Sequence, residues 1–152
     1  MKPVYEKATP KDCELLSETA RIAKGHWGYS KELLEQWHDD LTVTPDNFKN
    51  HVIYKGFFEN DFIGYFSLKD HGMYTELDGM WILPQYHGKG LGTDMILKAK
   101  EVARALHYKY IELFADPNAD GFYEKCGAKK TGKIPTIIED RFLNTYHFIL
   151  NE

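Results

Sequence analysis

Three glycines alternate within the segment HGKGLGT, residues 87–93, just before the longest helical pattern of the chain. The first turn of a helix has free backbone N–H groups and a partial positive charge, so it attracts anions. Glycine has no Cβ, and Gly88, Gly90 and Gly92 therefore let the backbone come close to a bound group. This spacing predicts a phosphate-binding loop at the start of a helix.

Two common phosphate-binding motifs do not fit this loop. The ATP-type pattern GxxxxGK[ST] needs a lysine after its last glycine, but Gly92 is followed by Thr93 and Asp94. The dinucleotide pattern GxGxxG needs its third glycine one position later. Both motifs occur in repeated βαβ units, whereas the strand patterns before this loop run as hairpins. The phosphate ligand is therefore of another kind.

Hydrophobic spacing and turn residues predict the elements that must position the loop. The predicted order is a strand at 4–8, helices after 9 and 30, a short helical piece after 44, strands at 51–58, 62–68 and 74–83, a helix at 91–106, a strand at 110–115, a short helix ending at 127 and a closing strand at 141–150. A strand, helix, strand passage among hairpins implies a mixed sheet with one parallel crossover. The predicted fold class is α/β (α+β).

The composition predicts one domain over residues 1–152, because 43% of the residues are hydrophobic and no linker interrupts the chain. The net charge of −4 argues against a nucleic-acid binder, which needs a clustered positive face. Neither a signal-peptide pattern nor an apolar run long enough for a membrane is present. We therefore expect a cytoplasmic protein with no nucleic-acid or membrane partner.

The cysteines and histidines predict no metal and no disulfide. Cys13 and Cys126 are the two cysteines, and they form no CxxC pair. The histidines show no HExxH or other metal-type spacing, and His51 is predicted to be an ordinary surface or hydrogen-bonded strand residue. The segment EDR at 139–141 is predicted to be a solvated turn.

The residues around the loop resemble a known family. The segment ILPQYHGKGLG, residues 82–92, is similar to the acetyl-CoA loop of the GNAT superfamily of N-acetyltransferases, V-x-P-x-x-[RQ]-G-x-G-x-[GA]. Asn118 and the segment FYEKCGA at 122–128 are similar to a second segment of that family. His87 departs from the pattern, because the family usually has Arg or Gln there, and Lys89 is a substitute source of positive charge.

The resemblance implies a GNAT-like single domain whose mixed central sheet is splayed between the fourth and fifth strands and flanked by helices. The pantetheine arm of acetyl-CoA would lie in that V, and the loop amides would bind its pyrophosphate. The implied cofactor-binding residues are Ile82, Leu83, His87, Gly88, Lys89, Gly90, Leu91, Gly92, Thr93 and Asn118.

Transfer of an acetyl group to an amine needs a general acid and a general base. Tyr123 occupies the family's usual general-acid position, where it would protonate the departing thiolate. Strand alternation puts Glu76 and Asp78 on one face of the strand at 74–83, and Glu76 is the first choice for the base. Gly79 in this strand predicts a bulge, which would change the assignment of faces.

The acceptor side is less defined by the sequence. Besides Glu76, the candidates for the base are Asp78, His26 and a water molecule. The aromatic segment GHWGY at 25–29, with Trp27, and the more distant Trp37 either hold an amine by π contacts or serve packing. Asp78 is a further candidate for binding the acceptor.

The predicted function is that of an acetyl-CoA-dependent N-acetyltransferase. The acetyl group would move to a primary amine by direct attack in a ternary complex, without an acyl-enzyme. The acceptor would be a small molecule or a protein, and the closing strand is a possible homodimer contact, as in many members of the family. The alternative is a non-catalytic acyl-CoA-binding sensor or regulatory module.

Overall fold

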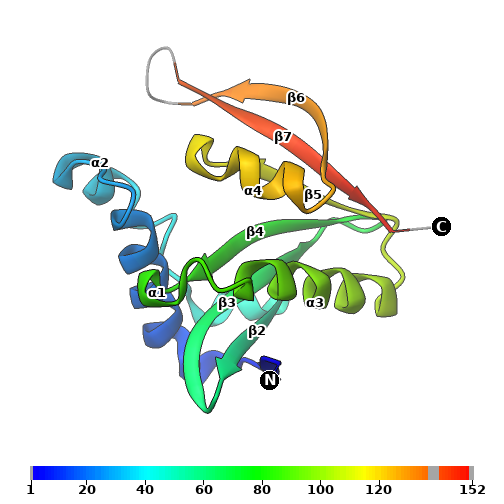
Figure 1. The fold of residues 1–152 in the computed structure, drawn as a ribbon, viewed down its shortest axis with the longest axis horizontal. Coiled ribbons are helices and arrows are strands. Elements are labelled where there is room, and N and C mark those ends of the chain that lie inside the picture. Colours follow the sequence, from blue (N-terminus) through cyan, green and yellow to red (C-terminus); the bar gives the residue numbers. More distant parts are fainter. Residues whose placement is uncertain (1, 137–140, 151–152) are drawn as a thin grey trace.

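The computed structural model describes residues 2–136 and 141–150, and it contains a seven-stranded mixed sheet in the order β1-β2-β3-β4-β5-β7-β6. Figure 1 shows the sheet with its flanking helices. The strands are β1 (Val4–Lys7), β2 (His51–Phe58), β3 (Asp61–Asp70), β4 (Thr75–Ile82), β5 (Tyr110–Ala115), β6 (Lys129–Pro135) and β7 (Phe142–Ile149), and the α-helices are α1 (Cys13–Gly25), α2 (Lys31–Gln36), α3 (Leu91–Ala105) and α4 (Asp120–Lys125).

The sheet is splayed between β4 and β5. These two strands are parallel neighbours, but just two residue pairs join them, Thr75 with Ile111 and Glu76 with Glu112. Beyond these pairs the strands separate, as Figure 1 shows. All the other neighbouring strands are antiparallel and pair over most of their length. The predicted mixed sheet, splayed between its fourth and fifth strands, is confirmed.

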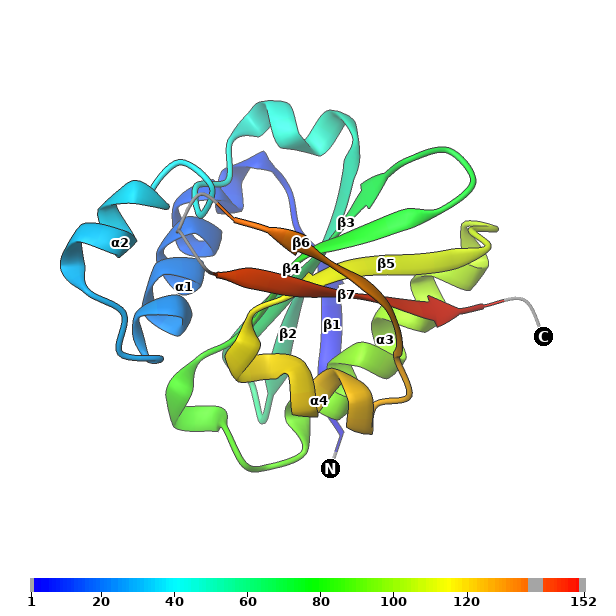
Figure 2. The ribbon, with the colours of Figure 1, turned by 90° about the horizontal axis from the view of Figure 1, so that it is seen from above.

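The two long helices pack on opposite faces of the sheet, as Figure 2 shows from above. Alternation along β3 turns Phe66 toward the core under α3, where it meets Met95. The same alternation turns Tyr65 toward the smaller core under α1, where it meets Leu16. Burial of both apolar helix faces holds the amino terminus of α3 and the carboxyl end of α1 at the mouth of the V.

Strand β6 is the element that the sequence analysis missed. Every residue of β6 is exposed, so the strand lacks the alternating apolar pattern that marks a half-buried strand. It has Lys129, Lys130 and Lys133 at the outer edge of the sheet, where charged side chains prevent pairing with other chains. Residues 129–135 form a strand because they pair with β7, and the local sequence of one segment does not reveal such a partner.

Candidate active site

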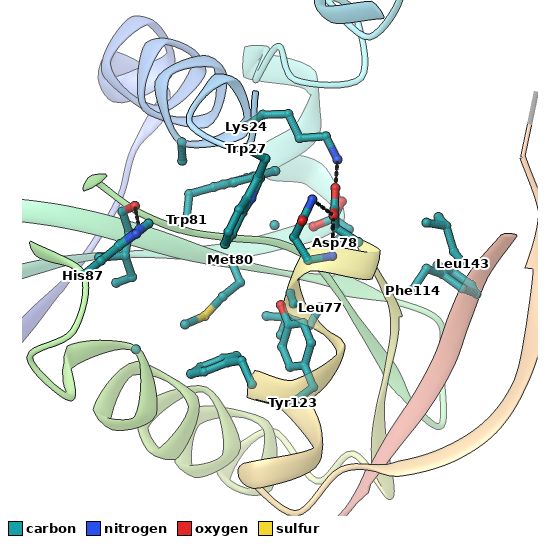
Figure 3. A pocket seen from close by; sticks show the side chains of 18 of the residues that line it. Lys24, Trp27, Leu77, Asp78, Met80, Trp81, His87, Phe114, Tyr123 and Leu143 are labelled. Atoms are coloured by element: carbon teal, nitrogen blue, oxygen red, sulfur yellow. Dashed lines mark hydrogen bonds and ion pairs between the residues drawn. The ribbon is translucent and has the colours of Figure 1, made fainter. Parts of the chain in front are cut away.

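A cavity of about 870 Å³ fills the mouth of the V between β4 and β5. Its wall is built from the end of α1, β4, the loop that precedes α3, the first turn of α3, the end of β5, and α4. Figure 3 shows Trp27, Met80 and Tyr123 approaching the same space from three different elements. The cavity therefore joins segments that are far apart in the sequence.

One end of the cavity is formed by the glycine loop. Gly88 and Gly90 have φ angles of 75° and 76°, the left-handed region that favours glycine. A Cβ atom on either residue would meet no protein atom within 4 Å. The first intrahelical bond of α3 runs from the Asp94 amide to the Gly90 carbonyl at 3.2 Å. The amides of residues 90–93 therefore have no helical partner, and the positive end of the helix lies on the cavity wall.

Gly92 has a different role from the other two glycines. It lies in the first turn of α3, and a Cβ there would be 3.1 Å from Cε1 of Phe122. Only glycine lets α3 approach α4 this closely without displacing the Phe122 ring. Tyr123 follows Phe122, so this contact fixes the general-acid candidate relative to the glycine loop.

The exposed edge of β4 forms the long side of the cavity. The Leu83 amide donates to the Ile63 carbonyl at 2.8 Å, so the backbone of Leu83 faces β3. Alternation along the strand therefore turns the backbone groups of Met80 and Ile82 toward the V. Leu83, whose amide is bonded within the sheet, does not line the cavity, whereas Met80, which the sequence analysis did not name, lines it.

The side chain of His87 lies against the same edge. His87 Nε2 is 2.9 Å from the Ile82 carbonyl oxygen, which can only accept, so this nitrogen donates. His26 and Trp27, just after α1, contact the His87 ring, with centroids 5.2 and 6.3 Å away. These contacts join the end of α1 to the loop before α3, and they explain how the aromatic segment reaches the cavity.

Tyr123 lies on α4 and lines the cavity between its two ends. Burial raises the pKa of its phenol well above the ordinary value, so the hydroxyl keeps its proton at neutral pH. Within the described part of the chain this hydroxyl makes no hydrogen bond. A protonated phenol without an internal partner is available to donate to a group in the cavity.

The predicted bulge in β4 is present, and it lies at Asp78. Ser67 of β3 pairs with Gly79, whereas the next residue, Leu68, pairs with Leu77. Asp78 is therefore the extra residue, and it lines the cavity. Its Oδ2 atom is 2.7 Å from Nε2 of His51.

Glu76, the first choice for the base, does not line the cavity. It lies where β4 and β5 are still paired, at the closed end of the V. Its Oε1 atom is 2.9 Å from His71 Nε2. The structure thus brings Asp78 to the cavity wall and leaves Glu76 outside it.

A charged cluster forms the other end of the cavity, and the sequence analysis missed it. Asp116, just after β5, accepts from Lys24 Nζ at 2.5 Å, from Arg141 at 3.4 Å and from the Tyr29 hydroxyl at 2.8 Å. The side-chain amide of Asn118 donates to the same carboxylate at 2.9 Å. Burial of this carboxylate alone would raise its pKa. The donors, chiefly Lys24, have the larger combined effect in the opposite direction, so the pKa of Asp116 is below its ordinary value.

Arg141 corrects the predicted solvated turn at 139–141. Its side chain is 15% exposed and bonds to the charged cluster, whereas residues 139 and 140 lie outside the described residues. Its guanidinium is 5.1 Å from the Trp37 ring centroid, and Lys24 Nζ is 4.6 Å from the same centroid. The Trp37 ring thus makes cation–π contacts with Lys24 and Arg141 of the protein itself. Trp27 is the more open ring, with 41% of its surface exposed.

The structure brings most of the predicted site residues together and leaves a few outside. The predicted residues that line the cavity are Trp27, Trp37, Asp78, Ile82, His87, Gly88, Gly90, Leu91, Gly92, Thr93, Asn118 and Tyr123. Those that do not line it are His26, Glu76, Leu83 and Lys89.

Two broader features concern only the described residues, 2–136 and 141–150. They contain no group of three or more His, Cys, Asp or Glu side chains that could hold a metal ion. None of their helices has the length and apolar character needed to cross a membrane.

Comparisons with solved structures give the same fold. The PaiA N-acetyltransferase of Thermoplasma acidophilum, solved with coenzyme A, is 21% identical, with a TM-score of 0.74 over 97% of this chain and 100% of that one. A GCN5-related N-acetyltransferase from Rhodopseudomonas palustris is 21% identical, with a TM-score of 0.81 over 99% and 97% of the two chains. The spermidine/spermine N-acetyltransferase SpeG of Vibrio cholerae is 16% identical, with a TM-score of 0.71 over 98% and 93%.

The sequence comparisons decide the family. No curated protein matches the sequence significantly. The model of the acetyltransferase (GNAT) family matches residues 14–128, which include α1, the bulged strand β4, the glycine loop and α4. This match covers most of the chain and contains the loop that suggested the resemblance. The chain therefore belongs to the acetyltransferase (GNAT) family.

Proposed function

We propose that this protein is an acetyl-CoA-dependent N-acetyltransferase that moves the acetyl group to a primary amine by direct attack in a ternary complex. The observation that carries the proposal is the single cavity that begins at the free amides of α3, passes Tyr123 and ends at Asp78 and the Asp116 cluster. An anion site, a proton donor and a carboxylate thus share one space. These are the groups that the reaction needs.

The residues present fit acetyl-CoA as the donor. The space beside Gly88 and Gly90 is open, and the amides of residues 90–93 have no helical partner, so they suit a diphosphate. The backbone groups of Met80 and Ile82 face the V, where an extended pantetheine arm would pair with them as an added strand does. The thioester would then lie near Tyr123. PaiA of Thermoplasma acidophilum, with the same fold, is solved with coenzyme A.

The reaction then follows from the positions of two side chains. Asp78 first takes a proton from the acceptor ammonium, and the neutral amine then attacks the thioester carbonyl. As the carbon–sulfur bond breaks, the Tyr123 hydroxyl gives its proton to the departing sulfur, and the proton that the new amide nitrogen loses returns to the Tyr123 oxygen. Since Glu76 lies outside the cavity, we assign the base to Asp78.

The cavity favours direct attack over an acyl-enzyme. Among its described lining residues there is no cysteine and no serine. Cys126 is near α4, but burial raises the pKa of its thiol above the ordinary value, so the reactive thiolate is disfavoured. In direct transfer both substrates must be bound at once.

The test is thiol release from acetyl-CoA in the presence of a panel of amines, comprising polyamines, aminoglycosides, amino acids and lysine peptides. We expect at least one primary amine to stimulate release, with intersecting lines in double-reciprocal plots when both substrates are varied. Parallel lines would contradict the ternary complex. Tight CoA binding without release for any amine would contradict the enzyme and support the binding module.

A further inference from the structure

His51 lies behind Asp78, on the side away from the large cavity. It is the first residue of β2, its side chain is only 8% exposed, and it does not line the large cavity. Its Nε2 atom is 2.7 Å from Oδ2 of Asp78. Asp78, the extra residue of the β4 bulge, makes this contact with the first residue of β2.

The hydrogen bond made by Nδ1 of His51 shows which ring nitrogen gains and loses a proton. Nδ1 is 2.7 Å from the backbone carbonyl oxygen of Asn47. A carbonyl oxygen only accepts hydrogen bonds, so Nδ1 keeps its proton in both charge states of the ring. Protonation and deprotonation of His51 therefore occur at Nε2, which faces Asp78. Whenever the imidazole is neutral, a bare nitrogen lies against the Asp78 carboxylate.

A second, smaller cavity of about 170 Å³ adjoins this pair. It is lined by polar groups that include His51, Asp39 and Tyr65, and it shares Asp78 and Gly79 with the large cavity. Its volume and polar lining suit a few water molecules. Asp78 thus borders both spaces, as do Asp40, Leu41, Gly79 and Trp81.

We propose that His51 is a positioning residue and proton-accepting partner of Asp78, and that the acceptor's proton leaves through the smaller cavity. This inference rests on the proposed function. The N–H bond of the ammonium breaks, and its electron pair stays on the amine nitrogen. The proton passes to the Asp78 carboxylate and on to Nε2 of neutral His51, which leaves an imidazolium–carboxylate pair. Nε2 of the imidazolium then gives the proton to water in the smaller cavity, which His51 and Asp78 both line, and Nδ1 keeps its own proton throughout.

The pairing makes the base stronger than a carboxylate alone. An isolated aspartate has a pKa near ~3.9 and an alkylammonium near ~10.4, so direct transfer between them is steeply uphill. The hydrogen bond that His51 donates to the Asp78 carboxylate is the largest influence on His51, and it raises the pKa of His51 above the ordinary value. Burial and the charge of Lys69 act in the opposite direction but do not cancel this effect. The other titratable groups that face the pair from the described elements are acidic or phenolic, namely Asp39, Asp40 and the buried Tyr65.

The active form has neutral His51, so kcat should rise with pH through the raised pKa of His51. Removal of the imidazole should remove this rise. A residue that only supports the fold would lower activity without removing an ionisation from the profile.

The chain contains a matched control. His71 and Glu76 form a second histidine–carboxylate pair on the same sheet, with Nε2 and Oε1 2.9 Å apart. Neither residue lines either cavity. His71→Gln therefore removes an equivalent pair outside the site.

The experiment measures kcat from about pH 5.5 to about pH 9 for the wild type, His51→Gln, Asp78→Asn and His71→Gln, with an amine from the panel. We expect His51→Gln to lower kcat at about pH 7.5 by ten- to a hundredfold, to remove the rise with pH and to leave the KM for acetyl-CoA within about twofold. His71→Gln should keep both the rate and the rise. A His51→Gln profile that matches the wild type, or a rise lost in His71→Gln instead, would overturn the relay.

A second measurement does not depend on turnover. NMR titration of the His51 ring should give a pKa above the ordinary ~6.5 in the wild type and a lower one in Asp78→Asn. An equal pKa in the two proteins would overturn the relay even if His51→Gln fails to fold. Failure of the proposed function is distinct, because the wild type itself would then release no thiol with any amine.

Discussion

Replacement of Tyr123 by phenylalanine should lower kcat at saturating acetyl-CoA by about a hundredfold or more, because a positioned proton donor contributes roughly 10²- to 10⁴-fold. The ring stays on α4 and only the proton is lost. Burial raises the pKa of the Tyr123 phenol, so the phenol is protonated and has a proton to give to the departing sulfur in the proposed reaction. The KM for acetyl-CoA should change little, since we propose that the α3 amides, and not Tyr123, bind the diphosphate.

The control for this variant is Tyr86→Phe. Tyr86 also lines the cavity, but it belongs to the loop before α3 and has no assigned part in proton transfer. Its replacement should leave kcat within about threefold, the range of changes that remove no transition-state interaction. Stability should also be unchanged in Tyr123→Phe, because the hydroxyl makes no hydrogen bond in the described part of the chain. An unaltered kcat in Tyr123→Phe would remove the general-acid role.

The second large effect concerns the charged cluster at Asp116. Asp116→Asn leaves Lys24 and Arg141 close together without a carboxylate, in a site where the three side chains are 14–15% exposed. Loss of one partner of a largely buried ion pair destabilises proteins by about 3 kcal/mol or more. We expect a loss of about 3 kcal/mol in the free energy of unfolding, measured by urea denaturation at neutral pH.

The exposed pair Lys49–Asp46 provides the control. Its side chains are 80% and 78% exposed, so Asp46→Asn should change stability by less than about 0.5 kcal/mol. Equal effects of the two variants would contradict the importance of the cluster.

The effect of Asp116→Asn should also depend on pH in a definite direction. Because the pKa of Asp116 is lowered in the folded protein, its carboxylate stabilises the fold at pH values above its unfolded pKa of ~3.9. This stabilisation is lost as the pH falls toward the lower pKa of the folded state. The stability difference between the wild type and Asp116→Asn should therefore shrink below about pH 4.

Much of the fold, and the glycine loop at one end of the cavity, could be predicted from local sequence patterns. The alternating glycines, the proline before them and the helical spacing after them are contiguous, and each reports a local backbone requirement. Gly88 and Gly90 do have left-handed φ angles. Gly92 instead meets a contact from α4, and only the packed helices show this.

The acceptor end was harder to predict because its residues come together only by folding. Lys24, Asp116 and Arg141 are contributed by the end of α1 and by the segments that follow β5 and precede β7. No spacing rule relates positions so far apart. The strand alternation that favoured Glu76 did not show that β4 and β5 are still paired there, whereas the bulge puts Asp78 on the cavity wall.

Binding of the coenzyme A diphosphate by the loop before α3 and the first turn of that helix is the proposal on which the others depend. Gly90 and Gly72 form a matched pair, with φ angles of 76° and 86°, and a Cβ atom at either position would have no other atom within 4 Å. Alanine at either position should cost about 1 kcal/mol of stability, because both require the left-handed conformation. Only Gly90 lines the cavity, and Gly72 lies in the turn between β3 and β4.

The deciding measurement is isothermal titration calorimetry of coenzyme A with the wild type, Gly90→Ala and Gly72→Ala. We predict one binding site in the wild type, a Kd at least about tenfold weaker in Gly90→Ala and a Kd within about twofold of the wild type in Gly72→Ala. Absence of binding heat in the wild type, or equal affinities in the two variants, would contradict the account.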